Sequence, residues 1–155
     1  VNSLIPDKND SINEIQTKRL IKILKKIIKN KTSYNIGICG MTYKNDTNII
    51  KNSQGDDLLK LIKKNKIRYN KINIYDDFLS QNEIKDIKGK IVLIENKKKF
   101  IQQSDIIFLM YNVKKLNFRK YKINKKKYIV DCWRLIENLP KPMIKIDLGK
   151  HSDYI

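Results

Sequence analysis

The chain has 155 residues, 41% of them hydrophobic, and a formal net charge of +18. This length predicts one domain, or one domain with an extension, and no run of residues approaches the roughly 18 consecutive apolar residues of a membrane helix. The polar and acidic start is not typical of a secretory signal, so we expect a cytoplasmic protein without membrane insertion. Because the first residue is Val1 rather than Met, we expect a fragment of a longer protein or a processed chain.

The positive charge comes mostly from lysines that are spread along the whole chain. Only four residues are arginine, whereas base and phosphate recognition favours the forked donors of arginine. The chain is also rich in Ile and Asn and contains no Ala, a joint bias that AT-rich codons would produce. We therefore assign most of the charge to solvated faces and do not expect nucleic acid as a partner; a basic nucleic-acid-binding α/β domain is kept as an alternative function.

The two cysteines, Cys39 and Cys132, lie at the ends of apolar, strand-like runs. Neither belongs to a C-x-x-C pair or a cysteine–histidine cluster, so the sequence predicts no metal site. We expect both to be buried, reduced thiols. His151 is the only histidine and stands near the end of the chain, and no serine or cysteine can be named as its catalytic partner; the residues therefore predict no catalytic nucleophile.

An amphipathic helix is expected first, at about 11–30, where a capping box of Ser11 and Glu14 precedes apolar residues at helical spacing. Strands and helices then alternate along the chain. We expect helices at 54–65, 80–88 and 96–103, a loop with a helix within 114–127, a helical turn at 135–139, and strands at 34–39, 71–75, 90–95, 106–110, 128–131 and 143–147. This alternation predicts a Rossmann-like α/β fold, a doubly wound and mostly parallel sheet preceded by an N-terminal connector helix.

The loop after the first strand is the most informative segment. Gly37 and Gly40 have the spacing G-x-x-G, so the dinucleotide fingerprint G-x-G-x-x-G is absent. Gly37 lies inside the strand, which indicates close packing. Asp76, at the end of the second strand, resembles the acidic residue that holds an adenosine ribose. Without the glycine fingerprint, a turn or helix cap is the better interpretation of Asp76.

Two cations follow strands of the predicted sheet. Lys44 comes after the first strand beside Tyr43, which offers a stacking face, and Arg134 follows a later strand at the same edge of the sheet. Together they would suit a nucleotide diphosphate. The alternative for each of them is an ordinary solvated cation in a loop.

The run G-M-T-Y-K-N-D-T-N-I-I-K-N-S at 40–53 resembles the motif G-L-x-[FY]-K-x-x-T-x-D-x-R-x-S, which opens the C-terminal domain of UDP-glucose/GDP-mannose dehydrogenases. Further segments resemble later motifs of that family in the same order: I-Y-D at 74–76, S-D-I-I-F-L-M at 104–110, V-D-C-W-R at 130–134 and D-L-G-K at 147–150. N-E-I-Q-T-K-R-L at 13–20 resembles the end of the family's central dimerisation helix region. The resemblance covers nearly the whole chain.

This resemblance implies an NAD-dependent UDP-glucose 6-dehydrogenase-like enzyme, which oxidises the C6 alcohol of a nucleotide sugar to a carboxylate for polysaccharide biosynthesis. It implies that 1–32 is the end of the dimerisation region and that 33–155 is the C-terminal nucleotide-sugar-binding (UDP) domain. The NAD fingerprint and the catalytic cysteine would lie upstream, so we expect no catalytic residue in this chain and no turnover by it alone. The full-length protein is expected to be a homodimer or larger.

By position in the family motifs, Tyr43, Lys44 and Arg134 would contact the nucleotide sugar, and Lys51 stands where the family has the arginine that reaches NAD. The chain departs from the family at Asn48-Ile49, which replace its acidic position, and at Lys51. Lysine in place of arginine loses bidentate phosphate geometry. The alternative function is therefore a standalone or degenerate nucleotide-binding or assembly module without catalysis.

Overall fold

The computed structural model describes residues 4–29, 33–43, 46–110, 116–134 and 136–148, with the backbone alone for 4–13. Its elements are α1 (Leu4–Ile28), β1 (Asn35–Cys39), α2 (Gln54–Lys64), β2 (Lys71–Tyr75), α3 (Gln81–Ile84), β3 (Ile91–Leu93), α4 (Lys97–Gln103), β4 (Ile106–Leu109), the 3-10 turn η1 (Phe118–Lys120), β5 (Lys127–Asp131) and β6 (Met143–Asp147). None of the helices in these ranges is long and apolar enough to cross a membrane.

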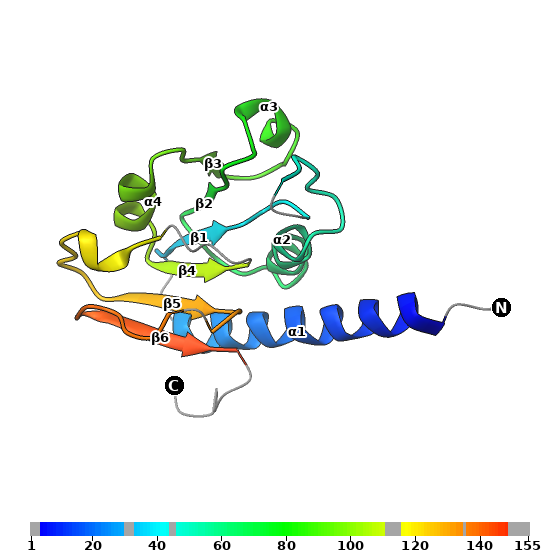
Figure 1. Ribbon diagram of the computed structural model, residues 1–155, viewed down its shortest axis with the longest axis horizontal. Helices are drawn as coiled ribbons and strands as arrows, with labels where there is room; N and C mark the ends of the chain where they lie inside the picture. Colours follow the sequence, from blue (N-terminus) through cyan, green and yellow to red (C-terminus); the bar gives the residue numbers. More distant parts are fainter. Residues whose placement is uncertain (1–3, 30–32, 44–45, 111–115, 135, 149–155) are drawn as a thin grey trace.

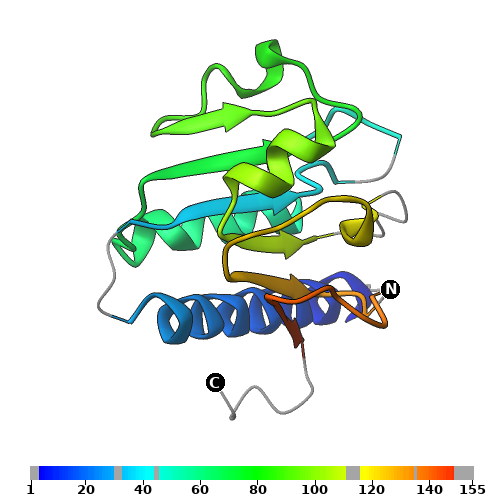
Figure 2. The ribbon, with the colours of Figure 1, turned by 90° about the vertical axis from the view of Figure 1, so that its left-hand side faces the viewer.

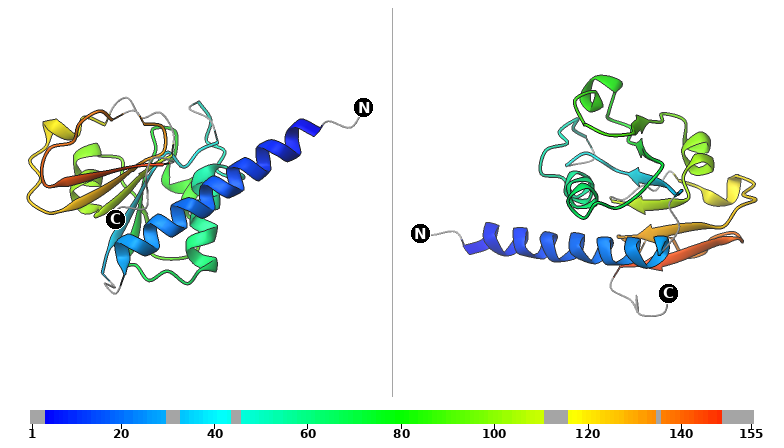
Figure 3. Two further views of the ribbon diagram at one scale, coloured as in Figure 1. Left: turned by 90° about the horizontal axis from the view of Figure 1, so that it is seen from below. Right: turned by 180° about the vertical axis from the view of Figure 1, so that it is seen from behind.

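All six strands join one parallel sheet in the order β3-β2-β1-β4-β5-β6 (Figures 1 and 2). Helices α1 and α2 cover one face, and α4 with η1 covers the other, as Figure 3 shows from below. The expected Rossmann-like, doubly wound fold is confirmed. Chain order reverses between β1 and β4, and ligands of such sheets bind at the carboxyl ends of the strands at this switch point.

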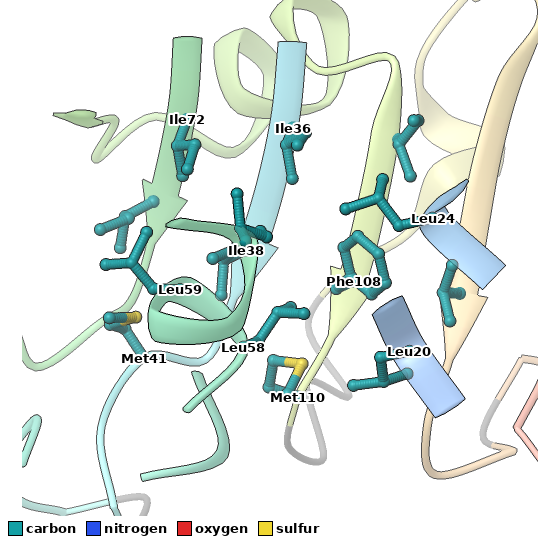
Figure 4. Packing of buried hydrophobic residues seen from close by; sticks show 14 of the residues in the cluster. Leu20, Leu24, Ile36, Ile38, Met41, Leu58, Leu59, Ile72, Phe108 and Met110 are labelled. Atoms are coloured by element: carbon teal, nitrogen blue, oxygen red, sulfur yellow. The ribbon is translucent and has the colours of Figure 1, made fainter. Parts of the chain in front are cut away.

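Each face of the sheet has its own hydrophobic cluster, because successive side chains of a strand point to opposite faces. In β1, Ile36 and Ile38 pack toward α1 and α2, whereas Cys39 belongs to the cluster on the α4 side. Figure 4 shows the first cluster, in which Leu24 of α1 and Leu58 of α2 lie over the strands. Burial of one such side chain contributes about 1.5–3 kcal/mol. The second half of α1 is thus part of the domain core, and the boundary at residue 32 stays a prediction.

Four helix predictions differ from the structure. Helix α1 begins at Leu4, so the prediction of a helix start with a capping box at Ser11 is wrong. Pro6 fits into the first turn because backbone N–H groups there make no intrahelical hydrogen bond, and the N–H that proline lacks is not missed. The predicted helix 80–88 is only α3, and within 116–127 the only helical piece is η1. Residues 136–139 contain no helical turn, because the N–H of Ile136 bonds the Asp131 carboxylate instead.

Candidate functional site

Asp76 holds the loop that leaves β1. Its carboxylate is only 4% exposed, and Oδ2 accepts hydrogen bonds from Met41 N at 2.8 Å, Thr42 N at 3.0 Å and Thr42 Oγ1 at 3.1 Å. Oδ1 accepts a further bond from Phe78 N at 3.0 Å. Both oxygens therefore accept hydrogen bonds from the protein's own loops, as expected for a residue that stabilises a turn. Asp76 thus positions the start of the segment that carries Tyr43.

Asp131 holds the loop that leaves β5 in the same way. This carboxylate is fully buried; Oδ1 accepts a bond from Trp133 N at 3.2 Å, and Oδ2 accepts one from Ile136 N at 2.8 Å. Sequence reasoning missed this role, although an aspartate at the carboxyl end of an apolar strand, as Asp131 is in β5 and Asp76 is after β2, was a usable signal. Two strand-end carboxylates thus fix two of the loops at the carboxyl edge of the sheet.

The start of α2 is packed tightly against the end of β1. Gly40 has a φ of 91°, which favours glycine, and a Cβ on Gly55 would lie 3.0 Å from the Gly40 carbonyl oxygen. Ser53 caps the helix by accepting from Asp56 N at 3.0 Å. Asp56 and Asp57 stand in the first turn, where negative charge competes with any bound anion. This helix start therefore lacks the features of a dinucleotide pyrophosphate site.

A pocket of ≈ 740 Å³ lies between α1, α2 and the β1–α2 loop. Its size is within the range of roughly 300–1,000 Å³ that small-molecule sites occupy. The residues that line it are Glu14, Thr17, Tyr43, Ile49, Lys51, Asn52, Asp57, Lys60 and Leu61. Two residues named in the sequence analysis, Tyr43 and Lys51, thus line the same pocket. The family resemblance assigned them to different ligands, Tyr43 to the nucleotide sugar and Lys51 to NAD.

The charges around this pocket are mostly paired. Lys60 Nζ lies 2.7 Å from Asp56 Oδ2, and this hydrogen bond raises the pKa of Lys60. Glu14 pairs with Lys18 at 2.8 Å, and the hydrogen bond from Lys18 lowers the pKa of Glu14. In the described part of the chain, no carboxylate pairs with the exposed Lys51. Lys51 therefore supplies positive charge that is available to a ligand.

The other two predicted ligand residues do not line this pocket in the described structure. Lys44 lies outside the described residues. Arg134 is exposed and has a φ of 55°, and its Nε and Nη2 donate to the Leu148 carbonyl oxygen at 3.4 and 3.1 Å. The guanidinium is thus turned toward the end of β6. The ligand roles of Tyr43, Lys44, Lys51 and Arg134 stay predictions.

Neither cysteine has the character of a nucleophile. Cys39 is fully buried, as expected, whereas Cys132 is only half-buried, which differs from the expectation. Burial raises the pKa of the Cys39 thiol well above its usual value and that of Cys132 to about 12. Across the described ranges, no group of three His, Cys, Asp or Glu side chains could hold a metal ion.

A family model described as the UDP binding domain of the UDP-glucose/GDP-mannose dehydrogenase family matches residues 37–138. Similar solved structures include a UDP-N-acetyl-mannosamine dehydrogenase from Staphylococcus aureus (TM-score 0.65, 16% identity), a UDP-glucose dehydrogenase from Pyrobaculum islandicum (0.62, 14%) and a UDP-D-ManNAc dehydrogenase from Pyrococcus horikoshii (0.62, 18%). These likenesses extend over 90%, 78% and 93% of this chain but only 31%, 27% and 32% of those chains, so it spans about a third of their length. No curated protein sequence matches the chain significantly. Because the family model covers more than half of the chain, this protein belongs to the UDP-glucose/GDP-mannose dehydrogenase family and contains its UDP binding domain.

Proposed function

We propose that this chain is the C-terminal nucleotide-sugar-binding domain of an NAD-dependent UDP-glucose 6-dehydrogenase-like enzyme, which oxidises the C6 alcohol of the sugar to a carboxylate. The observation that carries the proposal is the pocket shared by Tyr43 and Lys51 within a domain of this family. The chain's contribution would be binding and enclosure of the substrate. Hydride transfer would take place on groups outside these residues.

The chemistry of the pocket suits one end of a nucleotide diphosphate. The Tyr43 side chain is 59% exposed, so its ring has a face to offer to a base or sugar. Lys51 adds an ammonium that would attract phosphate as a point charge, without the geometry of a guanidinium fork. A ligand lying between them would touch α1, α2 and the β1–α2 loop together, which would couple binding to the packing of these elements.

The residues fit NAD poorly as a principal ligand. The G-x-G-x-x-G fingerprint is absent, and the first turn of α2 carries Asp56 and Asp57. NAD would accept the hydride when bound. By its position in the family motif Lys51 would reach NAD, as a single charged contact at the edge of the site; when NAD is absent, as in the titration below, the same ammonium lies in the pocket with Tyr43 and would attract a phosphate of UDP.

Calorimetry of the chain with UDP, UDP-glucose and GDP-mannose tests the proposal. Lys51→Ala should weaken UDP binding about fivefold, as expected for an exposed charge worth about 1 kcal/mol. Lys98→Ala is the matched control, because Lys98 is exposed on α4 at the opposite face of the sheet. The double variant Lys44→Ala/Arg134→Ala tests the remaining predicted cations. Absence of nucleotide binding by the wild-type chain, or equal binding by Lys51→Ala and wild type, would contradict the proposed site.

A module that binds nucleotides without catalysis is the second candidate, and one contact favours it. In the motif at 40–53, Ile49 stands at the family's acidic position, and its neighbour Asn48 donates from Nδ2 to Glu83 Oε1 at 3.3 Å, so this stretch bridges to α3. NAD⁺ reduction by the full-length gene product with UDP-glucose would support the enzyme. Nucleotide binding without any such reduction would support the non-catalytic module.

A further inference from the structure

Trp133 combines large exposure with a fixed position. Its side chain is 52% exposed, yet the indole Nε1 donates to the Met110 carbonyl oxygen at 2.7 Å. Its backbone N–H is held by the buried Asp131 carboxylate at 3.2 Å. An aromatic ring held at both its backbone and its side chain loses little further freedom when a ligand binds. The Trp133 ring is therefore already ordered before it contacts a ligand.

The ring is anchored where the chain order of the sheet reverses. Met110 directly follows β4, and its N–H donates to the Cys39 carbonyl oxygen at the end of β1 at 2.8 Å. The carbonyl oxygen of the same residue accepts the indole bond. The indole therefore reaches from the β5 loop to the junction of β1 and β4, the place at which open parallel sheets bind their ligands.

The neighbouring cation is directed elsewhere. Arg134 adopts a φ of 55° and bonds the Leu148 carbonyl oxygen at the end of β6. Of these two adjacent residues, Trp133 is the one whose side chain reaches the switch point. This loop thus offers a flat apolar ring there, a surface suited to stacking rather than to charge pairing.

We infer that Trp133 is a stacking platform for the planar base of a nucleotide at this edge of the sheet. The inference rests on the proposed function and adds a residue that the family resemblance did not assign. A uracil base of a UDP-sugar and the rings of NAD share this chemistry, so the experiment separates the two sources. Stacking on an aromatic ring typically changes affinity for a base by roughly 5- to 100-fold.

The chain has a single tryptophan and eight tyrosines, so tryptophan emission that is excited selectively over tyrosine reports on Trp133 alone. We expect UDP or NAD⁺ to quench this emission, and pyrophosphate, which has no base, to leave it unchanged. A response to UDP alone would assign the base of the nucleotide sugar, and a response to NAD⁺ alone would assign the cofactor. Unchanged emission under nucleotide concentrations that calorimetry shows to be saturating would overturn the inference and leave the proposed function standing.

Variants give the second readout. By calorimetry, Trp133→Leu should bind the quenching nucleotide about tenfold more weakly, whereas Trp133→Phe, which keeps a ring, should retain most of the affinity. Phe78→Leu is the control, since Phe78 is another exposed aromatic residue, located after β2. Equal affinities of Trp133→Leu and wild type would overturn the inference. A wild-type chain that binds no nucleotide would instead contradict the proposed function itself, and with it the basis of the inference.

Discussion

Replacement of Asp76 by asparagine tests how the β1–α2 loop is held. The variant keeps the size of the side chain but exchanges a carboxylate for an amide. In the structure, Oδ2 of Asp76 accepts three hydrogen bonds, from Met41 N, Thr42 N and Thr42 Oγ1, and Oδ1 accepts one from Phe78 N. An amide has one acceptor oxygen, so at least one of these donors would face an NH₂ group.

The expected loss follows from these four bonds. Hydrogen bonds to a charged acceptor contribute about 1.5–3 kcal/mol and neutral ones about 0.5–1.5, and a buried donor left without a partner costs about 1–3 kcal/mol. Because Asp76 is only 4% exposed, water cannot readily replace the lost acceptor. We expect Asp76→Asn to lower the free energy of unfolding by about 3 kcal/mol, or Tm by roughly 6–12 °C for a chain of this length.

Urea denaturation followed by circular dichroism gives the free energy of unfolding, provided that the m-value is unchanged. Asp86→Asn is the matched control: Asp86 is exposed, and the same chemical change there should alter stability by less than about 0.5 kcal/mol. Thr42→Val, alone and combined with Asp76→Asn, isolates the coupling between the two side chains. A loss below about 1 kcal/mol in Asp76→Asn would show that Asp76 is not the anchor of this loop.

Three further changes test other contacts. Gly37→Ala should destabilise the chain by about 1–3 kcal/mol in urea denaturation, because the new Cβ would lie 2.8 Å from Ser104 Oγ; wild-type stability would refute this packing. Lys127→Met should lower the free energy of unfolding by about 1–3 kcal/mol in the same assay, since the buried Nζ donates to the Gln102 and Ser104 carbonyl oxygens at the end of α4. Unchanged stability would show that these two hydrogen bonds only compensate for the cost of removing the ammonium group from water. Hydrogen bonds from Ser80 lower the pKa of Glu83 from 4.5 to about 2. The ionised Glu83 therefore stabilises the folded chain fully above pH 4.5, and this contribution disappears as the pH falls toward 2 and the carboxylate is protonated. Urea midpoints of Glu83→Gln and wild type should therefore differ at pH 7 and converge near pH 2, and a pH-independent difference would contradict the assignment.

The sheet could be predicted because its strands are short apolar runs separated by turn and helix signals. The positions of β1, β2 and β6 follow directly from such runs, with Ile36 and Ile38 buried as expected. The strand-end aspartates were visible in the sequence too, but only contacts across 35 residues show that Asp76 bonds Met41. Their anchoring role therefore depends on tertiary structure.

The arrangement of the candidate site was less accessible from the sequence. The direction of Arg134 depends on a positive φ and on a carbonyl oxygen that its side chain meets only after β6 has paired with β5. Likewise, Lys51 and Tyr43 share a pocket because α1 and α2 form its walls, and this packing is not a property of the loop itself. Motif order could identify the family, whereas the grouping of side chains required the fold.

Helix α1 would amplify a small tilt, because only its second half is packed against the sheet. It comprises 25 residues, about 37 Å at 1.5 Å per residue, and buried residues fix it to the core from Leu20 onward, while its first turns project past the sheet (Figure 1). A tilt of about 5° at the fixed half would displace the far end by roughly 2 Å. Thr17 and Glu14, which line the pocket, lie close to the packed half of the helix and would move much less than its first residues. Small adjustments around a bound molecule would therefore reach the far end of the helix as a larger displacement.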